Sequence, residues 1–243
     1  MSQKTSSYTV SARVKEKVES VEAFLNRYYK GFNIDSVYGF HNHCKMYGGR
    51  PFRYPELKDS DLKWMYENGI GYRIPITNIF LDDKMYDECK SFLAEHHRKG
   101  NSLILAVTNN VVARIREDFP LYHLESSTII SPNTLKGVQE RLDMFDTVVL
   151  APKWYQTERF TKIPDFSRIR CFIRAGCGFN CPNKICYKNF SEQNMLVHTT
   201  GPDCSMSTLE RAHLGRVHFN LEYMEMLGIT KFKVVHPQMH SEV

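Results

Sequence analysis

Short apolar runs and amphipathic stretches alternate along most of this chain. The apolar runs predict strands, and the stretches between them carry apolar residues at three- and four-residue spacing, which indicates helices. The expected strands are 36–41, 72–77, 102–107, 122–130, 147–150, 169–173, 217–219 and 231–235. Continuous apolar strands separated by helices are typical of a parallel sheet covered by helices. This α/β pattern predicts a (βα)8-like, TIM-type parallel barrel, regular or distorted, and an open doubly wound sheet is the alternative.

The N-terminal region predicts a helix ahead of the first strand. Ser11 is a candidate N-cap. Apolar residues then recur at helical spacing up to Gly31, namely Val14, Val18, Val21, Phe24, Leu25 and Tyr28. Residues 1–9 are polar, and we expect residues 1–10 to form a flexible tail. No linker or low-complexity run divides the chain, so we expect one α/β domain over residues 1–243.

Residues 177–207 interrupt the alternation, directly after the sixth expected strand. This long segment is rich in Gly, Pro, Asn and Cys, and loops of such length are usually functional or ordered by an ion. Its cysteines are Cys177, Cys181, Cys186 and Cys204, and Cys171 lies on the preceding strand. Thiolates are ligands that suit zinc or iron–sulfur clusters. We therefore expect a metal bound by the four loop cysteines, with small buried or surface thiols as the alternative.

Polar residues gather where the expected strands end, which is where parallel barrels carry their active sites. His41 and His43 are two residues apart, and on a strand both would point to one side, as metal ligands or as an acid and base. Arg50 follows two glycines and would bind a carboxylate or phosphate, as would Arg174 after the sixth strand. The alternatives are hydrogen-bonded imidazoles and solvated arginines. His123 and Glu125 form a weaker candidate pair, for which a structural role is the better interpretation.

The charge of the chain is mildly basic, with a net +5 and a pI near 8.7. This fits RNA or another anionic substrate. The densest basic series is interleaved with aromatic residues, which is typical of a nucleic-acid surface; the alternative is a solvated rim. Its members are Lys153, Arg159, Lys162, Arg168, Arg170, Arg174, Lys184 and Lys188. An odd number of cysteines without an export signal indicates reduced thiols and a cytoplasmic location. No apolar run reaches the roughly 18 residues of a membrane helix. The oligomeric state stays open.

Several segments together resemble the collagenase-like peptidase superfamily, a barrel group that includes iron–sulfur hydroxylases acting on RNA bases and ubiquinone precursors. The segments are Tyr38-Gly39, Gly48-Gly49-Arg50, 72–78, 124–128, the cysteine loop and 228–233. The resemblance implies a (βα)8-like barrel and a [4Fe–4S] cluster held by Cys177, Cys181, Cys186 and Cys204. The sequence shows neither a nucleophile elbow nor a zinc-protease helix motif, so peptidase activity is not expected.

Three functional hypotheses follow. The first is an enzyme with a cysteine-bound metal centre at the barrel mouth, such as an iron–sulfur hydroxylase or RNA-modification enzyme, with Arg50 and Arg174 binding an anionic substrate and His41 or His43 moving protons. The second is a metal-dependent hydrolase that uses His41 and His43. The third is a non-catalytic module, in which a zinc-ordered loop binds nucleic acid or protein.

Overall fold

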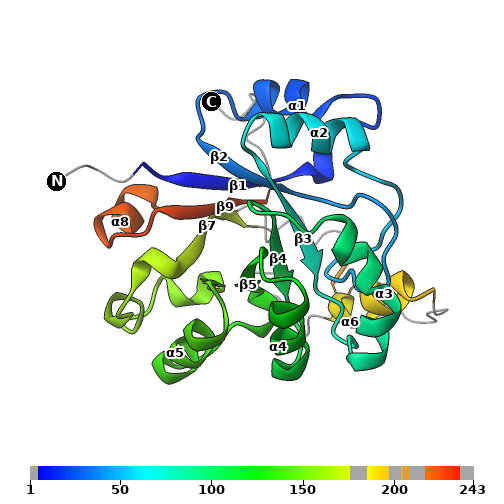
Figure 1. The fold of residues 1–243 in the computed structure, drawn as a ribbon. Coiled ribbons are helices and arrows are strands. Elements are labelled where there is room, and N and C mark those ends of the chain that lie inside the picture. Colours follow the sequence, from blue (N-terminus) through cyan, green and yellow to red (C-terminus); the bar gives the residue numbers. More distant parts are fainter. Residues whose placement is uncertain (1–4, 176–184, 197–203, 205, 208–216, 236–243) are drawn as a thin grey trace.

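In the part of the chain that the structure describes, eight parallel strands close into a barrel, which confirms the predicted (βα)8 type (Figure 1). The computed structural model describes residues 5–175, 185–196, 204, 206–207 and 217–235. The barrel strands are β1 (Ser7–Ser11), β2 (Ile34–Tyr38), β3 (Gly71–Ile76), β4 (Ser102–Leu105), β5 (His123–Ser126), β6 (Thr147–Val149), β7 (Ile169–Ala175) and β9 (Lys231–Val234). They pair in chain order from β1 to β7, and β9 closes the ring between β7 and β1.

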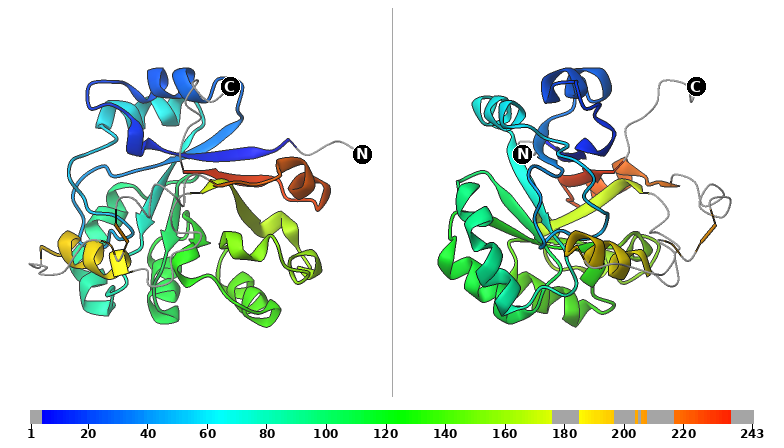
Figure 2. Two further views of the ribbon diagram at one scale, coloured as in Figure 1. Left: turned by 180° about the vertical axis from the view of Figure 1, so that it is seen from behind. Right: turned by 90° about the vertical axis from the view of Figure 1, so that its right-hand side faces the viewer.

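Helices cover the outside of the barrel (Figures 1 and 2). They are α1 (Val21–Tyr28), α2 (Asp59–Glu67), α3 (Asp83–Glu95), α4 (Asn109–Asp118), α5 (Leu135–Met144), α6 (Ile185–Asn194) and α8 (Leu221–Met226). Their apolar faces pack inward, as α3 does with Met85, Tyr86 and Leu93. Figure 1 shows α1 and α2 together on one side and α4 and α5 on the opposite side. No helix among the described residues is long and apolar enough to cross a membrane.

The N-terminal prediction was wrong. Ser7–Ser11 are not a tail but the strand β1, which pairs with β2 on one side and β9 on the other. Residues 12–14 form a 3-10 turn, and the first helix begins only at Val21, capped by Ser20. Conversely, the expected strand near residue 217 is β8 (Val217–His218), which pairs antiparallel with β7 and lies outside the ring. The ring therefore has the expected eight strands, but it includes β1 and excludes β8.

Asp61 fixes the start of α2 against α1. Its buried carboxylate accepts the backbone N–H of Val21 at 2.8 Å and that of Lys58 at 3.0 Å. The buried ammonium of Lys15 lies 3.3 Å from the same carboxylate. One acidic side chain thus satisfies N–H groups at the beginnings of two helices, where orphan donors and the helix dipole favour negative charge.

The barrel lumen contains charged side chains instead of a purely apolar filling. Arg73 on β3 forms an ion pair with Glu125 on β5, and Arg170 on β7 lies 3.3 Å from the same carboxylate. These three strands are not neighbours in the ring, so their side chains meet across the lumen. Nη2 of Arg170 also lies 3.1 Å from Oδ2 of Asp35, which is near the amino-terminal end of β2. A buried charge is costly unless it is paired, and this network supplies the counter-charges.

Candidate functional site

Helix α6 lies on the loops that follow β2 and β3, at the carboxyl end of the barrel. The buried side chain of Asn194, its last residue, donates to the backbone oxygens of Tyr47 and Arg50, both at 3.0 Å, and accepts the N–H of Phe52 at 2.7 Å. Ser191 accepts the N–H of Ile79 at 3.2 Å through its hydroxyl. Asparagine can satisfy donors and acceptors together, so one side chain attaches the helix to three backbone groups. Sequence reasoning missed Asn194, because no local motif marks this role.

The loop beneath α6 approaches the end of β3 closely at Gly48. A Cβ atom at this position would lie 2.1 Å from the backbone oxygen of Thr77 and 2.6 Å from the nitrogen of Asn78. Only glycine allows the two backbones to come this near. The side chain of Asn78 strengthens the contact, since its amide donates to the oxygens of Lys45 at 2.7 Å and Ser191 at 3.2 Å. The mouth is therefore built from three segments that interlock.

Two of the four predicted metal ligands fall within the described residues. Cys186 is the second residue of α6, and Cys204 accepts the N–H of Met206 at 3.4 Å; both are half-buried. Cys177 and Cys181 lie outside the described residues. No disulfide joins the described cysteines. Cys171 is fully buried and contacts Tyr155, so it belongs to the packed wall of the barrel.

His41 and His43 do not share one site. Strand β2 ends at Tyr38, so the alternation expected of a strand does not extend to these residues. His41 is buried and its Nε2 lies 2.9 Å from Oδ1 of Asp59 on α2. His43 is exposed at the mouth, where its Nε2 donates to the backbone oxygen of Asn194 at 3.0 Å. The two rings have different partners on different helices.

Arg50 has an internal partner at the mouth. Its guanidinium forms a two-point ion pair with Glu56 and lies over the ring of Phe40, 4.2 Å from the ring centre. Burial lowers the pKa of Arg50 to about 10. Glu56 in turn accepts the N–H of Phe40 at 3.0 Å. Arg50 thus braces the loop after β2. Arg174 is half-buried near the end of β7, where β7 pairs with β8 and β9.

Lys233 is a further basic residue of the lumen that the sequence reasoning did not single out. Its ammonium lies 4.4 Å from the centre of the Tyr38 ring and 5.4 Å from that of Phe172. Burial, together with the positive charges of Arg73 and Arg170, holds the pKa of Lys233 well below its usual value. The sequence does carry a signal for it. Lys231 and Lys233 alternate with the apolar Phe232, and this spacing puts both lysines on one face of the strand.

Replacing Lys233 with methionine should stabilise the fold at pH 7. The unfolded chain binds a proton at Lys233 more readily than the folded one, so folding stability rises with pH up to the ordinary lysine pKa. The K233M variant removes this slope, and we expect its free energy of unfolding at pH 7 to increase by roughly 1–3 kcal/mol, because the folded state no longer holds a partly desolvated ammonium beside two arginines. Urea unfolding at pH 7 and pH 9.5 measures both effects. Exposed Lys99 provides the control variant K99M, and equal pH slopes for K233M and the unaltered protein would contradict the expectation.

His123 and Glu125 do lie on one face of β5, as their spacing predicted. His123 Nε2 is 2.8 Å from the hydroxyl of Thr147 and 4.0 Å from Glu125. Burial lowers the pKa of His123 to about 4, with the nearby arginines and Lys231 acting in the same direction. Because Glu125 is engaged by Arg73 and Arg170, this pair belongs to the lumen network.

The basic series after β6 binds largely to the protein itself. Arg168 donates to the backbone oxygens of Leu142 and Phe145, and Arg159 donates to that of Asn133. Lys162 pairs with Glu158 at 2.6 Å. Arg170 is buried in the lumen, and Lys184 lies outside the described residues. These contacts weaken the series as a nucleic-acid surface, because several of its charges already have partners.

Comparisons with known proteins bear on the fold. No family model matches the sequence. No curated protein matches it either. Among solved structures, that of the U32 peptidase Mk0906 is similar over 98% of this chain and 95% of that chain, with a TM-score of 0.64 and 12% sequence identity. U32 peptidases are the collagenase-like group, so the resemblance expected from the sequence motifs is confirmed at the level of the fold.

Proposed function

We propose that this chain is a metal-centre enzyme that acts on an anionic substrate at the carboxyl end of its barrel. Cys177, Cys181, Cys186 and Cys204 hold the metal centre in this proposal. The observation that carries it is the attachment of α6, which contains Cys186, to the loops after β2 and β3 through Asn194 and Ser191. The described part of the cysteine segment is therefore attached to the end of the barrel that carries the active site in α/β-barrel enzymes.

The donor set fits a [4Fe–4S] cluster. Four thiolates from one segment are the usual ligands of such clusters, and the two that the structure describes, Cys186 and Cys204, are half-buried. The motifs shared with the collagenase-like group favour an iron–sulfur hydroxylase or RNA-modification enzyme, and zinc is the alternative metal. A bound cluster would supply electron transfer or a fixed charge beside the mouth.

Basic side chains of the lumen would hold the substrate. Lys233 faces two aromatic rings, and the charges that most affect its pKa are those of arginines. An anion at this position would offset that repulsion and raise the pKa of Lys233. Arg174 lies on β7 opposite Val234 of β9, beside the strand that carries Lys233. Arg50 could bind substrate only by giving up Glu56. Exposed His43 is the candidate proton carrier at the mouth, with its ring oriented by Asn194.

Metal analysis of the full chain tests the proposal. We expect protein purified without oxygen to contain iron and acid-labile sulfide and to show a broad absorption band near the visible edge. The C186S variant should lose the iron and the labile sulfide while keeping the far-ultraviolet circular dichroism of the parent. Half-buried Cys89 provides the matched control, because C89S removes a thiol of similar exposure outside the cysteine segment.

The outcomes separate the hypotheses. Zinc in place of iron would favour a structural loop or a hydrolase, and salt-sensitive RNA binding without turnover would favour a binding module. A chain without metal, or a C186S variant that retains the full amount, would overturn the cysteine-bound centre.

A further inference from the structure

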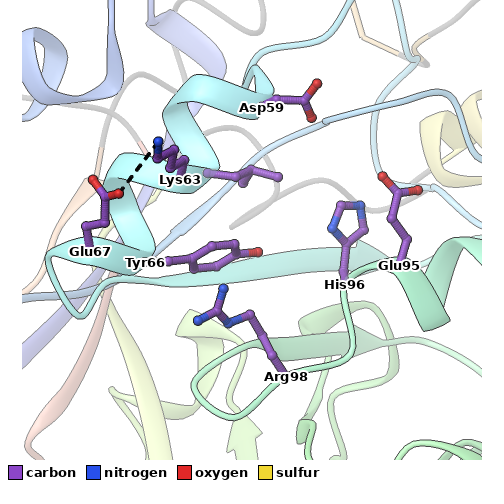
Figure 3. Close-up of a pocket in the computed structure, with 8 residues that line it drawn as sticks. Asp59, Lys63, Tyr66, Glu67, Glu95, His96 and Arg98 are labelled. Atoms are coloured by element: carbon purple, nitrogen blue, oxygen red, sulfur yellow. Dashed lines mark ion pairs between the residues drawn. The ribbon is translucent and has the colours of Figure 1, made fainter.

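A cleft of about 470 Å³ lies on the outer flank of the barrel, between α2 and the end of α3. Figure 3 shows Tyr66 and Lys63 from α2 on one side and Glu95, His96 and Arg98 on the other. This cleft is distinct from the mouth, because its walls are helices that pack outside the ring. Its polar residues take no part in the function proposed above.

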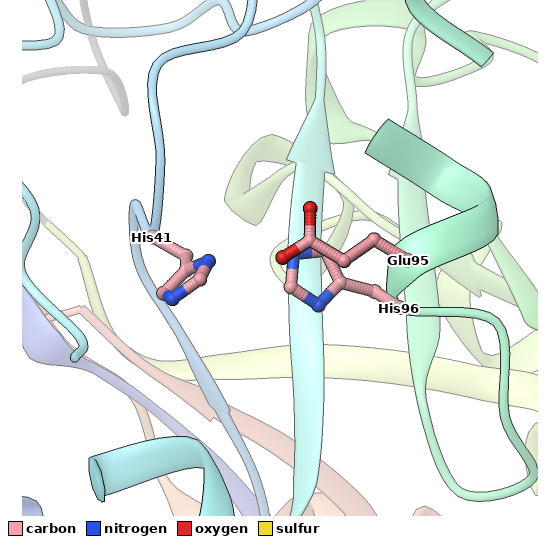
Figure 4. Close-up of side chains that lie close together, drawn as sticks. All are labelled: His41, Glu95 and His96. Carbon is pink, nitrogen blue, oxygen red and sulfur yellow. The ribbon is translucent and has the colours of Figure 1, made fainter. Parts of the chain in front are cut away.

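Three possible metal ligands meet beside the cleft, which two of them, Glu95 and His96, also line. One ligand atom each from His41, Glu95 and His96 lies within 4.8 Å of the other two. The histidine rings are 5.1 Å apart between centres and nearly perpendicular, at 84°. Figure 4 shows a nitrogen of each ring turned toward the other residue, with the Glu95 carboxylate beside His96. His41 comes from the segment after β2 and the other two from the end of α3, so the fold unites positions that are far apart in sequence.

The two histidines each bury a ring nitrogen that has no hydrogen-bond partner. These atoms are Nδ1 of His41 and Nε2 of His96, in side chains that are 3% and 5% exposed. A buried polar atom without a partner is costly, so such atoms are rare unless a water or an ion completes them. Two such nitrogens lie close together beside the carboxylate of Glu95. The three groups can act as ligands of one cation.

Asp59 orients His41 for binding a cation. Its Oδ1 lies 2.9 Å from Nε2 of His41, which therefore carries the ring proton and leaves the lone pair on Nδ1. A carboxylate that accepts from the far nitrogen of a ligating histidine is the usual outer partner in zinc sites.

We propose that His41, His96 and Glu95 form a second metal site, specific for zinc or a similar divalent cation. Two imidazoles and one carboxylate are a known ligand set of zinc sites with an open position. Imidazole ligands favour zinc over magnesium or calcium, which prefer oxygen. The adjoining cleft leaves room for water or a small ligand at the remaining position. The site does not depend on the cysteines and stands independently of the proposed function.

Cobalt binding to the full chain distinguishes the two sites. The double variant C181S/C186S removes the cysteine-bound centre, and we expect it to bind one equivalent of Co²⁺ with visible ligand-field bands but without thiolate charge-transfer absorption. Zinc should displace the cobalt. In this background H96Q should weaken binding at least about 100-fold, and D59N, which removes only the outer partner, by about 10–100-fold.

Two further variants keep the result interpretable. H97Q is the matched control, because His97 is adjacent but its Nε2 accepts the N–H of Leu121 at 3.0 Å instead of facing the cluster. E95Q changes an exposed side chain, so it preserves the fold if H96Q does not, and it should still weaken binding by at least about 10-fold. A C181S/C186S chain that binds no cobalt, or affinities of H96Q and E95Q equal to that of H97Q, would overturn the site. Neither result would affect the cysteine-bound centre, which is measured by iron and sulfide.

Discussion

Replacing Glu125 with glutamine should lower the free energy of unfolding by roughly 3–5 kcal/mol, because removing one partner of a buried ion pair leaves an uncompensated charge. Glu125 is 1% exposed and lies between Arg73 and Arg170, both of which are buried. In E125Q, Asp35 still pairs with Arg170 at 3.1 Å, so the loss should be concentrated on Arg73. Urea unfolding at pH 7, followed by circular dichroism, gives the difference directly.

A double-mutant cycle separates the effect of removing the whole ion pair from the effect of leaving one buried charge unpaired. We expect R73M/E125L to be far less destabilised than the sum of R73M and E125L, since an apolar pair of similar volume often replaces a buried ion pair without net cost. Additive effects, or a loss below about 1 kcal/mol in E125Q, would show that Glu125 is not the main counter-charge of the lumen.

The same lumen explains where the sequence misled. In β1 the positions that face inward are Ser7, Thr9 and Ser11, and the hydroxyl of Ser36 donates to that of Thr9 at 2.9 Å. A strand with polar residues facing a polar lumen lacks the continuous apolar run expected of a parallel barrel strand. Residues 7–10 therefore looked like part of a tail. The more apolar strands β3 and β4 are buried on both faces, and there the pattern predicted the strands well.

The proposed sites were predictable to different degrees. The cysteine segment and the mouth were visible in the sequence, because they depend on local composition and on the position of strand ends. The cluster in the flank cleft was not. His96 follows the last residue of α3, but its partner His41 precedes it by α2, β3 and α3, and only the departure of the chain from β2 after Tyr38 brings the two rings together.

Both proposed centres depend on the segment that follows β2. This segment leaves the ring early, so that His41 reaches the flank between α2 and α3 while Gly48 and Arg50 remain at the mouth. A change in this loop could thus affect the two sites together. Variants at the ligands themselves, as opposed to the loop, are needed to assign an effect to one centre.

Replacing Asn194 with alanine should release α6 from the mouth. The change leaves the oxygens of Tyr47 and Arg50 and the N–H of Phe52 without their partner, and each unsatisfied buried group costs about 1–3 kcal/mol unless water reaches it.

We expect two consequences of N194A: faster hydrogen exchange of the amides in residues 185–194, and weaker binding of metal by the cysteine segment. N194D should behave similarly, because its carboxylate keeps the acceptor for Phe52 but repels the two backbone oxygens. Q139A, which removes an exposed amide that donates to Asp143 on α5, is the control. If N194A exchanged at the same rate as the parent protein and retained its metal, the attachment of α6 would not be what places the cysteines, and the proposed centre would have to rest on the cysteine spacing alone.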